Sequence, residues 1–84
     1  MEGDRGVIFD GIEWDDANLE HATLRATSSE IEQAIWNAER MTRHRTEPDR
    51  VLIRSVTDGG RRLVIVAQLV RGRVRPTTAW EEDQ

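Results

Sequence analysis

Apolar residues follow a helical spacing in the middle of the chain. Four of them recur at positions that share one face of a helix, namely Ile31, Ala34, Ile35 and Ala38. Ser29 and Glu32 have the spacing of a capping box, in which each side chain binds the backbone N–H of the other residue. The pattern therefore predicts an amphipathic helix that begins near Ser29.

The residues before this helix predict a strand and a shorter helix. Alternating apolar and polar residues over 7–14 are typical of a short strand. Asp15 or Asp16 is placed to cap a helix that runs to about Arg25. Three residues recur at helical spacing within it and are expected to form its inner face: Ala17, His21 and Leu24.

From residue 41 the period of the pattern changes to two, which indicates strands. We expect them at residues 41–45, 51–56, 63–70 and 73–79. Asp58-Gly59-Gly60 and Arg71-Gly72 are hairpin turn signals, because glycine accepts the positive φ angles of tight turns. Pro76 has no N–H to donate to a ladder, so it belongs at an edge or a bulge.

The order of elements is thus β-α-α-β-β-β-β. It predicts an α+β fold in which two helices pack on one face of an antiparallel sheet. The 84 residues are enough for a single domain, with a core over residues 5–80 and an acidic tail at 81–84.

The composition narrows the chemistry. The chain has no cysteine and two histidines, which excludes disulfides, thiolate nucleophiles and cysteine-based zinc sites, so no metal or other cofactor is expected. No apolar run approaches the ~20 residues of a membrane span. The acidic N-terminal residues lack the layout of a signal peptide, so a cytoplasmic protein is expected.

Charge is divided unevenly along the chain. Residues 1–38 hold two arginines against nine acidic groups, residues 39–75 hold ten arginines against four, and the last nine residues hold three acidic groups and no arginine. The net charge of -4 therefore conceals a basic block. Such a block attracts RNA or an acidic protein segment.

Four short motifs resemble one family in the same order. Ile12-x-Trp14-Asp15-x-x-Asn18-x-x-His21 resembles the "WD..N..H" start of the BrnT toxins, which are small relatives of the RelE fold. The other three are similar to that family's "E-V-E", "GR.L.V" and "R..TA" motifs: Glu30-Ile31-Glu32, Gly60-Arg61-x-Leu63-Val64 and Arg75-x-x-Thr78-Ala79. Together they span residues 8–80.

This resemblance implies the toxin of a type II toxin–antitoxin system, an endoribonuclease that cuts RNA without a metal and blocks translation. It further implies a homodimer and a DNA-binding antitoxin encoded by an adjacent gene. The chain departs from the family pattern at two places. It has Leu24-Arg25-Ala26 where many members carry His-Gly, and Trp80 where arginine often follows the closing "TA".

Candidate site residues follow from the chemistry of RNA cleavage. Histidine suits proton transfer and arginine binds phosphate bidentately. We assign catalytic roles to His21, His44 and Arg75, His21 also by the resemblance. We assign phosphate binding to four arginines: Arg43, Arg45, Arg61 and Arg73. If the strands at 41–45 and 73–79 are neighbours, Arg43 and Arg45 line one groove with Arg73 and Arg75.

Each assignment has a structural alternative. In the alternative to catalysis, His21 is half-buried and hydrogen-bonded to a carboxylate such as Asp15. In the alternative to phosphate binding, the arginines lie on a solvent-exposed strand face. Trp14 and Trp36 are expected in the core, whereas Trp80 stacks on a base or forms an interface. For the whole chain, the alternatives are a catalytically weakened BrnT-like protein that only binds its antitoxin, and an unrelated small α+β interaction domain.

Overall fold

The computed structural model describes residues 10–38, 41–43, 46–47 and 49–82. The elements within them are β1 (Gly11–Ile12), α1 (Asp16–Ala22), α2 (Ser28–Asn37), β2 (Thr42–Arg43), β3 (Arg50–Val56), β4 (Arg62–Val70) and β5 (Arg73–Glu81). This confirms the expected α+β class and the expected order of elements. The predicted residues 7–9 and 44–45 lie outside the described residues.

The five strands form one sheet in the order β1-β5-β4-β3-β2. The last four strands pair antiparallel, as predicted. The sheet is mixed rather than antiparallel, however, because β1 pairs parallel with β5, with Gly11 opposite Arg73 and Ile12 opposite Val74. Alternation along a chain identifies a strand but not its neighbour, so the sequence pattern gave no sign of this parallel pair.

Two features fix the register between β4 and β5. The turn between β4 and β5 has positive φ at both central residues, 53° at Arg71 and 80° at Gly72, which is the requirement of the hairpin turn that matches strand twist. Further along this pair, the register shifts between Val66 and Ala67. The shift lies where Pro76 pairs with Ala67, and Thr77 donates its hydroxyl proton to the Val66 carbonyl over 3.0 Å. Pro76 therefore lies at a bulge, as predicted.

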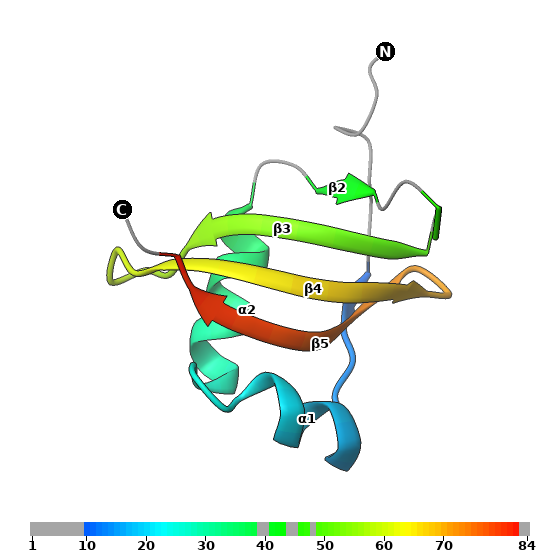
Figure 1. The fold of residues 1–84 in the computed structure, drawn as a ribbon, viewed down its shortest axis with the longest axis horizontal. Coiled ribbons are helices and arrows are strands. Elements are labelled where there is room, and N and C mark those ends of the chain that lie inside the picture. Colours follow the sequence, from blue (N-terminus) through cyan, green and yellow to red (C-terminus); the bar gives the residue numbers. More distant parts are fainter. Residues whose placement is uncertain (1–9, 39–40, 44–45, 48, 83–84) are drawn as a thin grey trace.

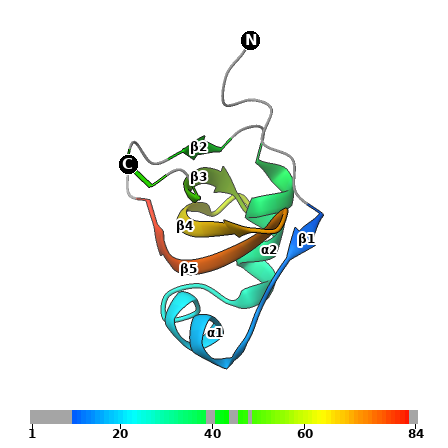
Figure 2. The same cartoon turned by 90° about the vertical axis from the view of Figure 1, so that its right-hand side faces the viewer.

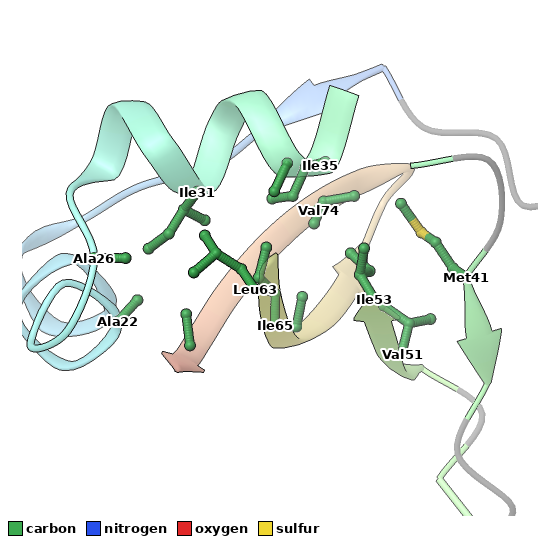
Figure 3. Close-up of a cluster of buried hydrophobic side chains, with 13 residues drawn as sticks. Ala22, Ala26, Ile31, Ile35, Met41, Val51, Ile53, Leu63, Ile65 and Val74 are labelled. Atoms are coloured by element: carbon green, nitrogen blue, oxygen red, sulfur yellow. The ribbon is translucent and has the colours of Figure 1, made fainter. Parts of the chain in front are cut away.

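The core lies between α2 and one face of the sheet (Figure 3). Ile31, Ala34 and Ile35 are buried there, which confirms the predicted inner face of this helix. They meet side chains from three strands: Val51, Ile53, Leu63, Ile65, Ala67, Val74 and Ala79. Trp14 packs against this cluster from its margin, as expected. Trp36 is 58% exposed, so its expected place in the core was wrong.

The start of α2 differs from the prediction by two residues. Its cap is Thr27, whose hydroxyl accepts from the Glu30 backbone N–H while the Glu30 carboxylate accepts from the Thr27 N–H. Glu32, the expected partner of Ser29, instead accepts from the indole N–H of Trp14 over 2.7 Å. Thr27 and Glu30 have the same capping-box spacing as Ser29 and Glu32. The first pair forms the cap, whereas Glu32 binds Trp14.

The helix α1 is capped by Asp15, one of the two predicted residues, and ends at Ala22 rather than near Arg25. Its predicted inner face was wrong. His21 and Leu24 are exposed, whereas Asn18 and Ala22 are buried. The helix lies along β5 at the margin of the sheet, while α2 crosses one face of it (Figures 1 and 2). Only α2 thus covers the sheet as predicted for both helices.

The opposite face of the sheet is covered by no described helix or strand (Figure 1). We call it the open face. It consists of the strand positions that alternate with the core residues: Arg50, Leu52, Arg54 and Val56 on β3, Arg62, Val64, Val66, Gln68 and Val70 on β4, and Arg73, Arg75, Thr78 and Trp80 on β5.

Candidate functional site

A cleft of about 350 Å³ opens where α1 meets the open face of the sheet. One wall is formed by residues of α1, and the other by β5 and the last part of β4. The lining residues are Ala17, Asn18, His21, Gln68, Arg75 and Thr77. The cleft therefore joins the first helix of the chain to its last strand.

An ion pair stands at this cleft. The Arg75 guanidinium donates to the Asp15 carboxylate over 2.6 Å, and the Arg75 side chain is 22% exposed. The same carboxylate caps α1 by accepting from the Asn18 N–H over 3.0 Å. The guanidinium of Arg75, followed by the Asn18 N–H, holds the pKa of Asp15 below its usual range, and Asp15 in turn raises the pKa of Arg75. Both groups are therefore charged at neutral pH.

Asn18 fixes α1 against β5. Its side-chain amide donates to the carbonyls of Glu13, over 3.0 Å, and Pro76, over 2.9 Å, while its oxygen accepts from the Asp15 N–H. Asn18 is 5% exposed, and these bonds use both donors and the oxygen of a buried amide. They hold the helix that bears His21 at a set position on the strand that bears Arg75.

Two of the three predicted catalytic residues, His21 and Arg75, line the same cleft. His21 is exposed there rather than half-buried, and the carboxylate of Asp15 binds Arg75 and the cap instead of the imidazole. Arg73 lies on the open face beside Gly11 of β1, with Glu13 at 3.9 Å. His44 lies outside the described residues.

The groove of four arginines does not form. It required the strands at 41–45 and 73–79 to be neighbours, but β3 and β4 lie between β2 and β5. Arg43 also pairs opposite the buried Val51, so it shares the helix-covered side of the sheet and not the open face. Arg45 lies outside the described residues. A phosphate site on Arg73 and Arg75 therefore takes no contribution from Arg43.

Arg61 is held by three acceptors. Its guanidinium pairs with Glu30 over 2.8 Å and with Glu81 over 3.2 Å, and it donates to the Arg25 carbonyl over 2.7 Å. These contacts tie the start of α2 to the end of β5. They raise the pKa of Arg61, chiefly through Glu30. Phosphate binding by Arg61 remains a prediction and would compete with this clamp.

Trp80 is 38% exposed on the open face, opposite the buried Val64. It stands on the same strand and the same face as Arg75, separated from it by the bulge. This position suits either of its predicted roles, since a flat indole beside guanidinium groups can stack on a base or pack against a protein.

Two polar residues of the cleft were missed by the sequence interpretation. Gln68 is the one polar side chain in the apolar run of residues 63–70, and that interruption was the signal available for it. Thr77 follows Pro76 at the bulge, which turns an additional side chain toward the cleft. Both add hydrogen-bonding groups beside Arg75.

No protein-family model, curated protein or solved structure matches the chain. Within residues 10–38, 41–43, 46–47 and 49–82, no three His, Asp or Glu side chains are grouped to hold a metal. In the same residues no helix has both the length and the apolar character to cross a membrane.

The cleft offers an imidazole, a guanidinium–carboxylate pair, an amide and a hydroxyl, a set suited to anion binding and proton transfer.

Proposed function

We propose that the chain is a BrnT-like toxin that cleaves RNA in the cytoplasm without a metal, and that the cleft between α1 and β5 is its site. A homodimer and an antitoxin encoded nearby belong to this proposal through the motif resemblance. The observation that supports it most is that His21 and Arg75, chosen from sequence for proton transfer and phosphate chemistry, line one cleft although they lie on different elements.

The proposed reaction is attack by the ribose 2′-hydroxyl on the adjacent phosphate. The bond from O2′ to phosphorus forms as the bond from phosphorus to O5′ breaks, leaving a 2′,3′-cyclic phosphate and a 5′-hydroxyl. Arg75 stabilises the added charge on the phosphate oxygens. The His21 imidazole takes the 2′-hydroxyl proton, and its conjugate acid or water returns one to the leaving oxygen.

Arg75 must bind the phosphate beside Asp15 or in place of it during this reaction. Its guanidinium has five N–H donors, and in the free protein one of its nitrogens binds Asp15. The phosphodiester monoanion of an RNA strand in the cleft either shares the guanidinium with Asp15 or displaces the carboxylate. Gln68 and Thr77 provide further groups for the substrate backbone.

The experiment is induced expression of the chain in a bacterial host, with growth and RNA integrity followed together, and cleavage of RNA by the purified protein in EDTA. We expect growth arrest with RNA fragmentation, and cleavage that falls by about 100-fold or more in His21→Ala and Arg75→Ala. Arg25→Ala removes an exposed arginine outside the cleft and keeps the activity. Cleavage unchanged in both cleft variants would refute the site.

A second candidate function is that of a catalytically silent relative which only binds its antitoxin. The 2.6 Å ion pair favours it, because Asp15 already occupies the guanidinium that the reaction needs. The motif departures at Leu24-Arg25-Ala26 and Trp80 point the same way. Normal growth with soluble protein and intact RNA would establish this version over the nuclease.

A further inference from the structure

We propose that the open face is the docking surface for an acidic, apolar protein segment, whose carboxylates meet the arginines of this face while its apolar side chains cover the aliphatic residues between them. The consequence of this binding for the cleft rests on the proposed function, but the binding itself does not.

Charge complementarity is the first observation. The open face carries five arginines, and none of its strand positions is acidic: Arg50, Arg54, Arg62, Arg73 and Arg75 are spread over β3, β4 and β5. A chain with a net charge of -4 has thus collected positive charge on the one side of its sheet that no described element covers. Such a face selects an acidic partner during diffusional encounter.

The chain itself shows that these arginines accept carboxylates. Four carboxylates from segments beside the strands pair with arginines of the open face, with Glu82 at 3.7 Å from Arg54, Glu13 at 3.9 Å from Arg73, Glu47 at 3.2 Å from Arg50 and Asp15 at 2.6 Å from Arg75. In the first two pairs the charged atoms are far apart, and the side chains of Arg54 and Arg73 are 67% and 49% exposed. A partner's carboxylates can replace such pairs at little cost.

The apolar residues of the face decide the class of partner. Val56, Val70 and Trp80 are 43%, 37% and 38% exposed, and Leu52 and Val66 are partly exposed between them. Four of these five are aliphatic. Nucleic-acid bases stack on aromatic rings or guanidinium planes, whereas aliphatic surface gains most from burying apolar side chains of a peptide. The face therefore fits a protein segment better than RNA.

The open face continues into the cleft, because Gln68 and Arg75 belong to both. A segment bound along β4 and β5 would place its own carboxylate near Arg75 and cover the approach to His21. If the cleft cleaves RNA, the same partner is its inhibitor. Regulation then requires no conformational change in this chain.

The test begins with a random-peptide display library selected against the purified protein. We expect the selected peptides to be enriched in Asp and Glu together with Leu, Ile or Phe, relative to the starting library. One selected peptide, titrated into isotope-labelled protein, should shift the resonances of Val64, Val66 and the Trp80 indole. Enrichment of basic peptides, no enrichment, or shifts confined to α2 would each overturn the proposal.

Matched variants separate the face from general charge effects. Arg62→Glu reverses a charge on the open face, whereas Arg25→Glu makes the same change in the segment between the helices. We expect the first to weaken the peptide by at least tenfold and the second by less than twofold. Glu82→Gln removes an internal competitor of the peptide and should tighten binding, whereas Glu20→Gln on α1 should not.

Single-stranded RNA is the remaining arm of the test. If RNA displaces the peptide and shifts the resonances of Val66 and Trp80 in its place, the open face binds nucleic acid and the proposal is wrong. Failure of the nuclease proposal appears separately, as intact RNA and normal growth. Peptide binding that persists in a protein without RNA cleavage leaves this inference standing.

Discussion

Asn18 shows at the scale of one residue why part of this site was hidden in the sequence. Hydrophobic periodicity assigns polar residues to the solvent, so the inner face of α1 was predicted around Ala17, His21 and Leu24. Asn18 takes the inner position because all three of its side-chain bonds are made inside the protein. His21, which periodicity placed on the inner face, and Arg75 were chosen as site residues from their chemistry alone, and both line one cleft.

Replacing Asn18 by alanine should destabilise the protein by about 2 kcal/mol, because the buried carbonyl of Pro76 then loses its donor. The measurement is urea unfolding of wild type and variant. Asn37→Ala is the matched control, since Asn37 also donates to a carbonyl, that of Val56, but from an exposed position that water can occupy. We expect it to cost less than about 1 kcal/mol. Equal costs would show that Asn18 does not anchor α1.

Elements were predictable to the extent that their patterns are local. The inner face of α2, the long strands β3 to β5 and both hairpin turns follow from residues close in sequence, and the structure confirms them. The parallel pairing of β1 and the choice between two capping boxes depend on distant residues. Glu32 is bound by Trp14, 18 residues away, a contact to which local spacing is blind.

The cap of α2 gives a prediction at this scale. Thr27→Ala removes the hydroxyl that accepts from the Glu30 N–H and should cost about 1 kcal/mol. Ser29→Ala alters the residue that the sequence pattern favoured and should change stability by less than about 0.5 kcal/mol. Thermal or denaturant unfolding of the two variants decides between the boxes. A larger loss in Ser29→Ala would restore the sequence-based assignment.

Across the whole molecule, arginine–carboxylate contacts join segments that are far apart in the chain. Arg75 links β5 to the start of α1 through Asp15, and Arg61 links the same strand to the start of α2 through Glu30. The charge division seen in the sequence is thus partly neutralised within the fold, because acidic residues at the starts of both helices pair with arginines from the second half of the chain. Which acid meets which arginine follows from strand order, and this is the part that the sequence pattern left open.

These contacts make stability depend on pH. The pKa of Asp15 is lowered chiefly by Arg75 and that of Glu30 chiefly by the Thr27 N–H, with Arg61 second. A carboxyl with a lowered native pKa stabilises the fold fully above its ordinary pKa, and this contribution is lost as pH falls through the native value. We therefore expect the free energy of unfolding to decrease below about pH 4.5.

The variants Glu30→Gln and Asp15→Asn should each reduce this acid dependence, because the titrating group is gone. Ser29→Ala introduces no change of charge and should retain the wild-type slope. The measurement is the free energy of unfolding, obtained with denaturant at a series of pH values from acid to neutral. An identical slope in wild type and both carboxyl variants would contradict the lowered pKa values.

The junction of α1 with β5 has a consequence for the synthesis of the protein. The bond from Asn18 to the Pro76 carbonyl joins residues that are 58 positions apart, and both walls of the cleft depend on it. Chains fold on the ribosome as they emerge from it, so α1 has no strand to dock against until translation of β5 is finished. A nascent or prematurely terminated chain that lacks β5 lacks the cleft, and any activity that belongs to the cleft begins only after this strand has been released.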